Sequence, residues 1–326
     1  MPKSAIIRRF GGPEVISIEE VPHEKPGAGQ VLLRHQASAI HLADPLMREG
    51  LYYFKPDLPA VLGIEGAGQI EQVGPGVNNF KVGERVSYRF SLGSYSEERV
   101  IDTQHLQKLP NEIDTKVSVA IGTRGLTAQY LLRQLYPIKP EDIVLIHAAA
   151  GGMGGVLTQW AKHLGAIVIG TVGNREKVKV AELNGCDYVI NYNQDNFADV
   201  VLDITNNIGV PVVYDSVGLS AYKNNLKVLS PRGWLINYGH SSGFLPSIDA
   251  MELNTKSLVF TKASLKDFNS TAEDNHRMIT EVNEMITGGF IKANITREYT
   301  LDEISKAHED ILNRKTNGTV ILTFND

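Results

Sequence analysis

The stretch Ile143-Val144-Leu145-Ile146-His147-Ala148-Ala149-Ala150-Gly151-Gly152-Met153-Gly154 reads as a buried strand that runs into a glycine-rich turn. An amphipathic helix follows, because apolar residues recur at helical spacing at Val156, Leu157, Trp160, Ala161 and Leu164. Against the G-x-G-x-x-G pattern, Ala149 takes the first position, Gly151 the second and Gly154 the third. Such a turn lets the backbone and the helix N-terminus approach a pyrophosphate. The alternative is a turn that serves helix packing alone.

Strand and helix signals alternate on the carboxyl side of this stretch, which predicts a doubly wound parallel α/β sheet, a Rossmann domain. The strand candidates are 143–148, 166–171, 188–191, 210–215 and 234–238. The region before it, from Lys3 to about Phe90, has short alternating apolar runs between Gly and Pro turns, and predicts a β-rich domain.

Two helical stretches and a β run at 319–322 follow Lys262, and this tail is too short for a domain of its own. We therefore expect it to return to the first domain. The predicted boundaries are 1–125 with 262–326 for the β-rich domain and 126–261 for the inserted Rossmann domain.

Composition excludes several functions. A net charge of −5 without a long Lys/Arg block argues against a nucleic-acid surface or an anionic membrane surface. The single cysteine, Cys186, allows neither an intrachain disulfide nor a multi-cysteine zinc cage, and we expect it to be a packing residue. No apolar run is long enough to span a membrane and no signal peptide is visible, so we expect a cytoplasmic protein with small-molecule partners.

The end of the second Rossmann strand predicts the cofactor. An NAD site would place Asp or Glu near residue 173 to bind the ribose 2′-OH. This chain has Gly173 and Asn174 there, with Arg175 and Lys177 close behind. Cations at a helix start are mildly disfavoured by the helix dipole, and a 2′-phosphate would explain them, so NADPH is favoured over NADH. The alternative is ordinary solvated charge.

Several further motifs match one family. They are Gly11-Gly12-Pro13-Glu14-Val15, Gly63-Ile64-Glu65-Gly66-Ala67-Gly68, Gly83-Glu84-Arg85-Val86, Gly125-Leu126-Thr127-Ala128, Val213-Tyr214-Asp215-Ser216-Val217-Gly218 and Gly239-His240-Ser241-Ser242-Gly243. In order and spacing the chain resembles the NADPH:quinone oxidoreductases, the zeta-crystallin-like branch of the medium-chain dehydrogenase/reductase superfamily. The resemblance implies a GroES-like catalytic domain built from both chain ends, a Rossmann insertion, a cleft between them and commonly a homodimer.

The resemblance also implies a set of cofactor residues. Around the pyrophosphate and the 2′-phosphate it implies Gly152, Met153, Gly173, Lys177, Tyr192 and Arg314. Along the rest of NADPH it implies Thr127, Tyr130, Ser216, Gly239, His240, Ser241 and Ser242.

No metal is expected. Zinc-dependent alcohol dehydrogenases of the superfamily carry His in a G-H-E motif, where this chain reads Gly63-Ile64-Glu65, and a Cys on the strand-loop before it, whereas the only cysteine here, Cys186, is far away in the sequence. Without a Lewis acid, the favoured chemistry is hydride addition to an electron-poor acceptor, with hydrogen bonds to the developing oxyanion.

The stretch from Ile40 to Tyr52 matches the family's stretch at the nicotinamide. Arg48 and Tyr52 match its pattern and are candidate donors to the acceptor oxygen, although Arg48 also suits a solvated surface and Tyr52 a loop-packing role. His41 departs from the family's frequent Asn and is a candidate hydrogen-bond or proton donor, with a structural histidine as its alternative. Leu46 replaces a frequent Tyr.

The leading prediction is an NADPH-dependent quinone oxidoreductase. The alternatives are an NADPH-dependent enone, alkenal or enoyl-thioester reductase, and, outside enzymes, an NADPH-binding sensor or an RNA-binding protein.

Overall fold

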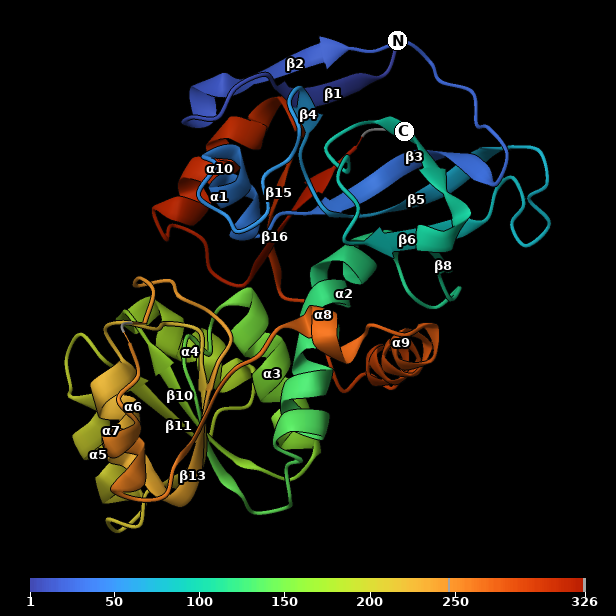
Figure 1. Ribbon diagram of the computed structural model, residues 1–326. Coiled ribbons are helices and arrows are strands. Elements are labelled where there is room, and N and C mark those ends of the chain that lie inside the picture. The colour runs from blue at the N-terminus through green and yellow to red at the C-terminus, as the bar shows by residue number, and fades with distance from the viewer. Residues whose placement is uncertain (246, 325–326) are drawn as a thin grey trace. The chain divides into compact units, whose positions relative to one another are not determined.

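The computed structural model describes residues 1–245 and 247–324, and its residues form two compact units. The first unit comprises Met1–Thr123 and Ala293–Asp326, and the second comprises Arg124–Lys292 (Figure 1). The insertion of one unit into the other was predicted, but the observed boundaries at 123 and 292 differ from the predicted ones at 125 and 261.

The second unit is built on a six-stranded sheet in the order β11-β10-β9-β12-β13-β14, in which all neighbouring strands are parallel. This is the doubly wound Rossmann order, so the predicted fold class is confirmed. The strands are β9 (Ile143–Ile146), β10 (Ile167–Val172), β11 (Tyr188–Asn191), β12 (Val210–Asp215), β13 (Leu229–Asn237) and β14 (Val259–Lys262).

Helices cover both faces of this sheet, as Figure 1 shows with α5, α6 and α7 on one side and α2 and α3 on the other. The helical segments are α2 (Thr115–Gln129), which belongs to this unit only from Arg124 onward, a π-helical segment (Tyr130–Leu135), α3 (Gly152–His163), α4 (Arg175–Leu183), α5 (Phe197–Ile204), α6 (Tyr222–Val228), α7 (Ala250–Asn254), α8 (Leu265–Phe268) and α9 (Ala272–Thr287).

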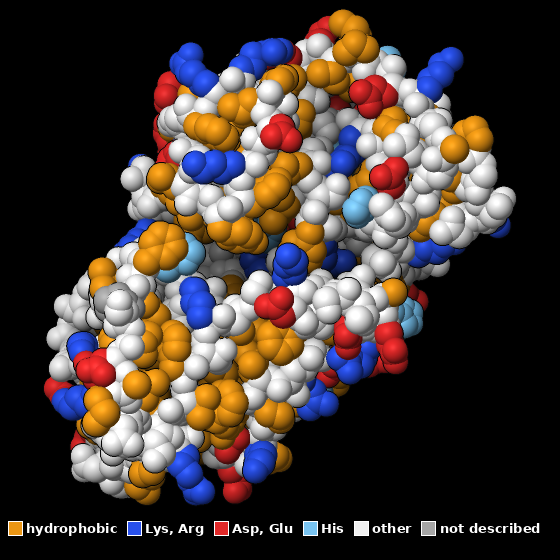
Figure 2. Space-filling model, viewed as in Figure 1, with side chains coloured by type: hydrophobic (Ala, Val, Ile, Leu, Met, Phe, Trp, Pro, Cys, Tyr) orange, Lys and Arg blue, Asp and Glu red, His pale blue; other side chains and the backbone are white. Residues whose placement is uncertain are grey.

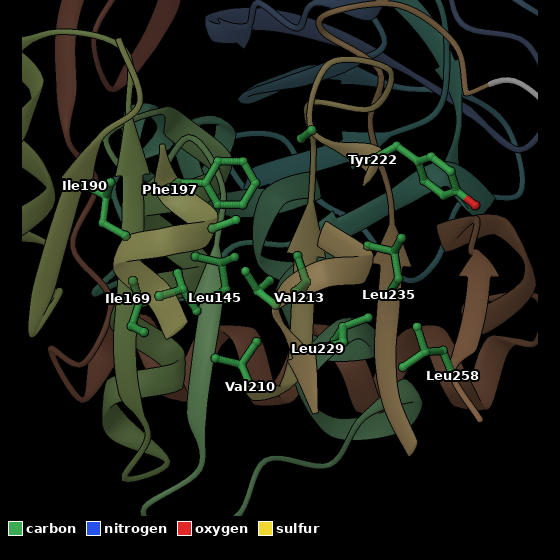
Figure 3. Packing of buried hydrophobic residues seen from close by; sticks show 14 residues of the cluster. Leu145, Ile169, Ile190, Phe197, Val210, Val213, Tyr222, Leu229, Leu235 and Leu258 are labelled. Atoms are coloured by element: carbon green, nitrogen blue, oxygen red, sulfur yellow. The ribbon is translucent and has the colours of Figure 1, made fainter. Parts of the chain in front are cut away.

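One buried cluster of this unit joins strands to helices. Leu145, Val213 and Leu235 project from the central strands toward Phe197 of α5 and Tyr222 of α6 (Figure 3). Burying side chains of this size stabilises the unit by about 1.5–3 kcal/mol each. The packed sheet holds its strand ends, where the candidate site residues lie, in fixed positions.

The stretch 262–292 belongs to the second unit, not to the first as its sequence position suggested. Phe268 of α8 stacks on Tyr130, with ring centroids 4.6 Å apart. Glu281 of α9 accepts hydrogen bonds from Gln129 at 2.9 Å and from Arg133 at 3.0 Å. These contacts hold α8 and α9 against the helical segment that begins the second unit.

The first unit is mostly β. A seven-stranded sheet runs β15-β16-β3-β5-β6-β8 with β7 paired to β3, and a three-stranded sheet runs β2-β1-β4. The strands are β1 (Lys3–Ile7), β2 (Ile16–Glu20), β3 (Gln30–Ala39), β4 (Ala60–Val61), β5 (Glu65–Val73), β6 (Arg85–Arg89), β7 (Glu98–Asp102), β8 (Leu106–Lys108), β15 (Ile295–Tyr299) and β16 (Thr319–Thr323). The antiparallel pairing of β16 with β3 returns the end of the chain to this unit.

Short helices complete the first unit. They are α1 (Ala43–Arg48), α10 (Ile304–Leu312) and the 3₁₀ segments Pro13–Val15, Thr103–His105 and Leu301–Glu303. Buried Met47 of α1 and Ile304 and Ala307 of α10 belong to the same apolar cluster as Ile7 of β1. This packing fixes α1, which carries one of the predicted acceptor residues.

Candidate functional site

The glycine turn after β9 is packed tightly against the start of α3. A Cβ added at Gly154 would lie 2.2 Å from the carbonyl oxygen of Ala148, so only glycine fits. Gly151 is the N-cap of α3 and supplies no side-chain hydrogen bond to the first turn. The N–H of Gly151 closes the turn by donating to the Ala148 carbonyl at 2.8 Å. The amides of Gly152 and Met153 and the positive end of the helix dipole are therefore the groups available for an anion.

A second group of predicted cofactor residues lies where the neighbouring strands β10 and β11 end. Asn174 caps α4, because its Oδ1 accepts a hydrogen bond from the backbone N–H of Lys177 at 3.0 Å. A Cβ at Gly173 would lie 2.5 Å from the hydroxyl of Tyr192, so that hydroxyl lies over the glycine. The structure thus brings together four predicted cofactor residues, Gly173, Asn174, Lys177 and Tyr192.

A third turn forms at the ends of β12 and β13. Gly239 lies against Ser216, since a Cβ there would be 2.7 Å from the Ser216 carbonyl oxygen. The backbone N–H of Ser241 donates to the same oxygen at 3.1 Å, and Ser242 Oγ donates to the carbonyl of Val217 at 2.8 Å. The predicted Ser216 and Gly239–Ser242 residues therefore share one rigid turn.

The buried carboxylate of Asp215 anchors that turn from below. Its Oδ1 accepts the N–H groups of Val217 at 2.7 Å and Gly218 at 3.0 Å, and its Oδ2 accepts from Asn237 Nδ2 at 2.9 Å. Within the turn, the His240 ring stacks on Phe244 with centroids 4.4 Å apart. Partial burial, and then the charge of Lys262, lower the pKa of His240, so its ring is neutral at pH 7.

Three predicted cofactor residues belong to other elements than these strand ends and turns. Thr127 belongs to α2, and Tyr130 begins the π-helical segment, where it is buried and burial raises the pKa of its hydroxyl. Arg314 follows α10 in the first unit, with a positive φ of 56°. All the other predicted cofactor residues belong to the second unit.

The first unit holds the three predicted acceptor residues. His41 lies between β3 and α1, and its Nε2 is 2.9 Å from Oε2 of Glu65, the first residue of β5. The other carboxylate oxygen, Oε1, accepts the backbone N–H of Thr123 at 2.9 Å. Arg89, at the end of β6, adds an ion pair to Oε1 at 3.2 Å. His41 is therefore the outer end of a charged network, Arg89–Glu65–His41.

Asp44 fixes the backbone on which His41 is carried. Its Oδ2 accepts the His41 N–H at 2.7 Å and the hydroxyl of Tyr95 at 2.8 Å, and its side chain is buried. Its contacts with the His41 backbone fit a structural role, which holds the loop in place.

Arg48 is buried and uses its guanidinium within the first unit. Nε donates to the carbonyl of Gly11 at 3.0 Å, Nη1 donates to His308 Nδ1 at 3.2 Å, and Nη2 contacts Glu49. These contacts favour a structural role. The predicted role of Arg48 as a hydrogen-bond donor to the substrate oxygen stays a prediction that these contacts do not support. Its sequence alternative, a solvated Arg, is wrong, since Arg48 is 0% exposed.

Tyr52 is partly buried, with its ring centroid 4.2 Å from that of Tyr53. Burial, and then the hydrogen bond with Tyr53, raise the pKa of the Tyr52 phenol, so the hydroxyl keeps its proton and can donate a hydrogen bond.

The network also contains residues that sequence reasoning missed. Glu65 was noted only as part of a motif without its zinc ligand, and neither Arg89 nor Thr123 was singled out. The one available signal was an acidic residue at the start of an apolar strand, because a carboxylate there has to be paired when it is buried.

The described residues contain no group of three or more His, Cys, Asp or Glu arranged to hold a metal ion. Among the same residues, no helix is both long and apolar enough to cross a membrane. On the face in view in Figure 2, positive and negative side chains are interspersed.

Comparison with known proteins defines the class. Residues 27–134 match the alcohol dehydrogenase GroES-like domain, and residues 152–286 match the zinc-binding dehydrogenase model. The chain is therefore an oxidoreductase of the medium-chain dehydrogenase/reductase type, with a GroES-like domain and a Rossmann domain.

The relatives narrow this class. Quinone oxidoreductase of Pseudomonas aeruginosa is 39% identical over 99% of both chains, and 2-haloacrylate reductase of Burkholderia sp. is 40% identical over 99% of both. The structure of Escherichia coli quinone oxidoreductase complexed with NADPH matches with a TM-score of 0.93 at 37% identity, over 99% of this chain and 100% of that one. The chain belongs to the quinone oxidoreductase family, as its motifs predicted.

Proposed function

We propose that this chain is an NADPH-dependent quinone oxidoreductase that passes a hydride to a quinone without a metal. The observation that carries the proposal is the site at the ends of β10 and β11, where Tyr192 lies over Gly173 and Asn174 caps the helix that carries Lys177. A 2′-phosphate would gain charge-assisted hydrogen bonds there, and no carboxylate stands at the ribose position. The E. coli relative complexed with NADPH supports this choice.

When bound, NADPH supplies the hydride, and the chain's residues place the cofactor and orient the acceptor. We propose that the pyrophosphate lies on the amides of Gly152, Met153 and Gly154, and that Gly151 shapes the turn before them. The remaining predicted contacts are Thr127, Tyr130, Ser216, Gly239, His240, Ser241, Ser242 and, toward the 2′-phosphate, Arg314. Tyr52 and His41 are proposed as the groups that meet the acceptor.

A specific observation favours a second candidate, reduction of a conjugated carbonyl. Such an acceptor needs a proton on carbon after the hydride, and the Glu65-held imidazole of His41 is a suitable proton source. The relative named 2-haloacrylate reductase supports this candidate. Its product is a saturated carbonyl, whereas a quinone gives a hydroquinone, so product analysis separates the two. Saturable NADPH binding without turnover would instead indicate a sensor or an RNA-binding protein.

The test of the first proposal is steady-state oxidation of NADPH and NADH with 9,10-phenanthrenequinone, in wild type and in Lys177→Ala. We expect the substitution to raise KM for NADPH about tenfold, with kcat and the NADH parameters nearly unchanged, because a phosphate contact made equally in the ground and transition states is lost. Lys179→Ala, an exposed lysine on the same helix, is the matched control. Equal effects on NADPH and NADH would overturn the assignment of the 2′-phosphate.

The metal-free reaction has its own test. Ile64 stands where zinc-dependent relatives carry a ligand, and Cys186 is far from it in sequence. We expect dialysis against EDTA to leave quinone turnover unchanged. Loss of activity that Zn²⁺ restores would show that a metal site exists.

We also propose that the protein is a cytoplasmic homodimer. An NADPH-dependent reductase with one cysteine suits a reducing compartment, and the family resemblance supports the dimer. Cell fractionation tests the compartment. Sedimentation equilibrium tests the dimer, for which the expected mass is twice 35.8 kDa.

A further inference from the structure

We infer that His41 is the proton donor to the acceptor and that Glu65 and Arg89 are positioning residues that hold its imidazole in the donating form. The inference rests on the proposed function and deepens it, because it extends the substrate class to acceptors that must receive a proton on carbon. It depends only on contacts within the first unit.

Glu65 is anchored through both of its carboxylate oxygens. The residue is 1% exposed, so its negative charge needs partners that replace water. Oε1 accepts the Thr123 N–H at 2.9 Å and lies 3.2 Å from Arg89 Nε, which is close enough for an ion pair although the N–H is not aligned for a hydrogen bond. Only Oε2 then faces His41, and it does so at a fixed position.

The contact with Glu65 fixes the tautomer of His41. A carboxylate can only accept a hydrogen bond, so Nε2, which lies 2.9 Å from Oε2, carries a hydrogen in both the neutral and the charged ring. The proton that the ring exchanges is therefore the one on Nδ1. Within the described residues, Nδ1 makes no hydrogen bond, and the His41 side chain keeps 12% of its surface exposed. The free nitrogen is thus the one available to a substrate.

Helix α2 leaves room for the Glu65 carboxylate at Gly122. A Cβ on Gly122 would lie 2.1 Å from Glu65 Oε1 and 2.6 Å from Arg89 Nε. The carboxylate therefore occupies the space that any other residue would fill. The helix backbone at Thr123 can then donate directly to it.

The proposed reaction adds a hydride and then a proton to the C=C bond of the acceptor. NADPH is oxidised as its hydride forms a C–H bond at the β-carbon of a conjugated carbonyl, and the π electrons of the C=C bond move to give an enolate. The enolate takes the Nδ1 proton of His41 at its α-carbon, and the neutral ring is reloaded from water. A quinone does not need this proton on carbon, because its reduced oxygens are protonated by solvent.

The test compares trans-2-hexenal with 9,10-phenanthrenequinone in the full-length protein with NADPH. In His41→Asn, which introduces the residue that the family often carries, we expect the ratio of kcat for the enal to kcat for the quinone to fall about 100-fold, the loss typical of a missing general acid. In Glu65→Gln we expect this ratio to fall at least about tenfold, since the orienting partner is removed. The double variant should lose no more than His41→Asn alone.

The matched control is Glu98→Gln. Glu98 is also a buried glutamate of the first unit, and it contacts His23 at 3.0 Å and Arg34 at 2.6 Å, but it is not part of the Arg89–Glu65–His41 network. It should cost folding stability as Glu65→Gln does, without changing the ratio. An equal fall of the ratio in this control, or equal losses with both acceptors in Glu65→Gln, would overturn the positioning role.

Two readouts separate this role from a structural one. One is the split between kcat and KM, since His41→Asn should lower kcat for the enal and leave KM for the enal nearly unchanged, because a proton donor acts in the transition state. Nitrogen-15 spectra should show His41 protonated on Nε2, a state lost in Glu65→Gln. A ring protonated on Nδ1 alone would overturn the inference.

The proposed function and this inference fail differently. Wild-type turnover of the quinone with none of the enal leaves the proposed function standing and overturns the inference. Absence of NADPH oxidation with either acceptor overturns both.

Discussion

Gly154 shows how one missing side chain decides the contact between α3 and the turn before it. Alanine is a better helix former than glycine by about 1 kcal/mol, so an exposed helical site would gain stability from Gly→Ala. Here the added Cβ would meet the Ala148 carbonyl oxygen at 2.2 Å, and that atom is backbone and cannot turn away. We expect Gly154→Ala to lower the free energy of unfolding by about 2 kcal/mol and to weaken NADPH binding.

Urea unfolding and NADPH titration check this expectation. Gly151→Ala is the control, because its Cβ would lie 3.2 Å from the same oxygen and its φ of −81° suits any residue. The control should lose less stability than Gly154→Ala, because at 3.2 Å the oxygen has to give by only a few tenths of an ångström. A Gly154→Ala variant as stable as the control would contradict the packing argument.

Single residues differ in how far the sequence reveals them. Gly154, Asn174 and Lys177 were predictable because their roles depend on neighbours a few residues away in a strand–turn–helix segment. The partner of His41 was not, since Glu65 is 24 residues away and Thr123 a further 58 along the chain. Only the folded sheet brings these groups together.

At the level of elements, helix α2 contacts the charged network Arg89–Glu65–His41 at Gly122. Helix propensity favours Gly122→Ala by about 1 kcal/mol. Displacing the buried Glu65 carboxylate from Arg89 and Thr123 opposes it, and breaking a buried pair costs about 3–5 kcal/mol. We therefore expect a net loss of about 2–4 kcal/mol in the unfolding free energy, with a lower enal-to-quinone ratio.

The measurement is urea unfolding together with the two-acceptor assay. Gly288→Ala would not serve as a control, since its Cβ would also meet a backbone oxygen, at 3.0 Å. Ser118→Ala, a small change at a buried position one turn earlier in α2, is the better reference. A stabilised Gly122→Ala variant would show that the carboxylate can move without cost.

The bounds of β13 and the placement of α8 and α9 could not be predicted from the sequence pattern. The strand signal of β13 covered only 234–238, whereas the strand runs Leu229–Asn237, because Pro231 and Gly233 interrupt the pattern and the register shifts where β13 pairs with β12. Helix α9 buries Met278, Val282 and Met285. Such a buried face shows that a helix is covered but not by which element, so the assignment of α8 and α9 needed the structure.

At the level of the whole molecule, the fold class was predictable because the glycine turn and the alternating strands are local signals repeated along the chain. The charge balance of the interior was not, because it depends on which polar groups end up far from water. Two histidines of the first unit, His35 and His308, are buried within it, at 2% and 0% exposure.

These two histidines make the stability of the first unit sensitive to acid. Burial, and then the charge of Arg99, lower the pKa of His35 to about 3. Burial, and then the charge of Arg48, lower the pKa of His308 to about 3. Arg48 can only donate, so Nδ1 of His308 accepts and its hydrogen lies on Nε2. A second proton on Nδ1 would face the guanidinium.

The sign of the effect follows from proton uptake. An unfolded histidine titrates near pH 6.5 and the folded ones near 3, so between these values the unfolded chain binds more protons. The stability is fully present above pH 6.5 and is lost as pH falls, by about 1.4 kcal/mol per pH unit for each histidine. We therefore expect the free energy of unfolding to fall by about 3 kcal/mol per unit below pH 6, with carboxylates adding to the slope only under about pH 5.

Urea unfolding of the first unit at pH 7, 6.5, 6, 5.5 and 5 measures this slope. His308→Gln should be less stable than wild type at pH 7, because the contact with Arg48 is altered, yet its slope should be smaller by about 1.4 kcal/mol per pH unit. His105→Gln, at an exposed position of the same unit, should keep the wild-type slope. If His308→Gln kept that slope as well, the buried ring would have to take up its proton in the folded state, and the neutral tautomer bound to Arg48 would be wrong.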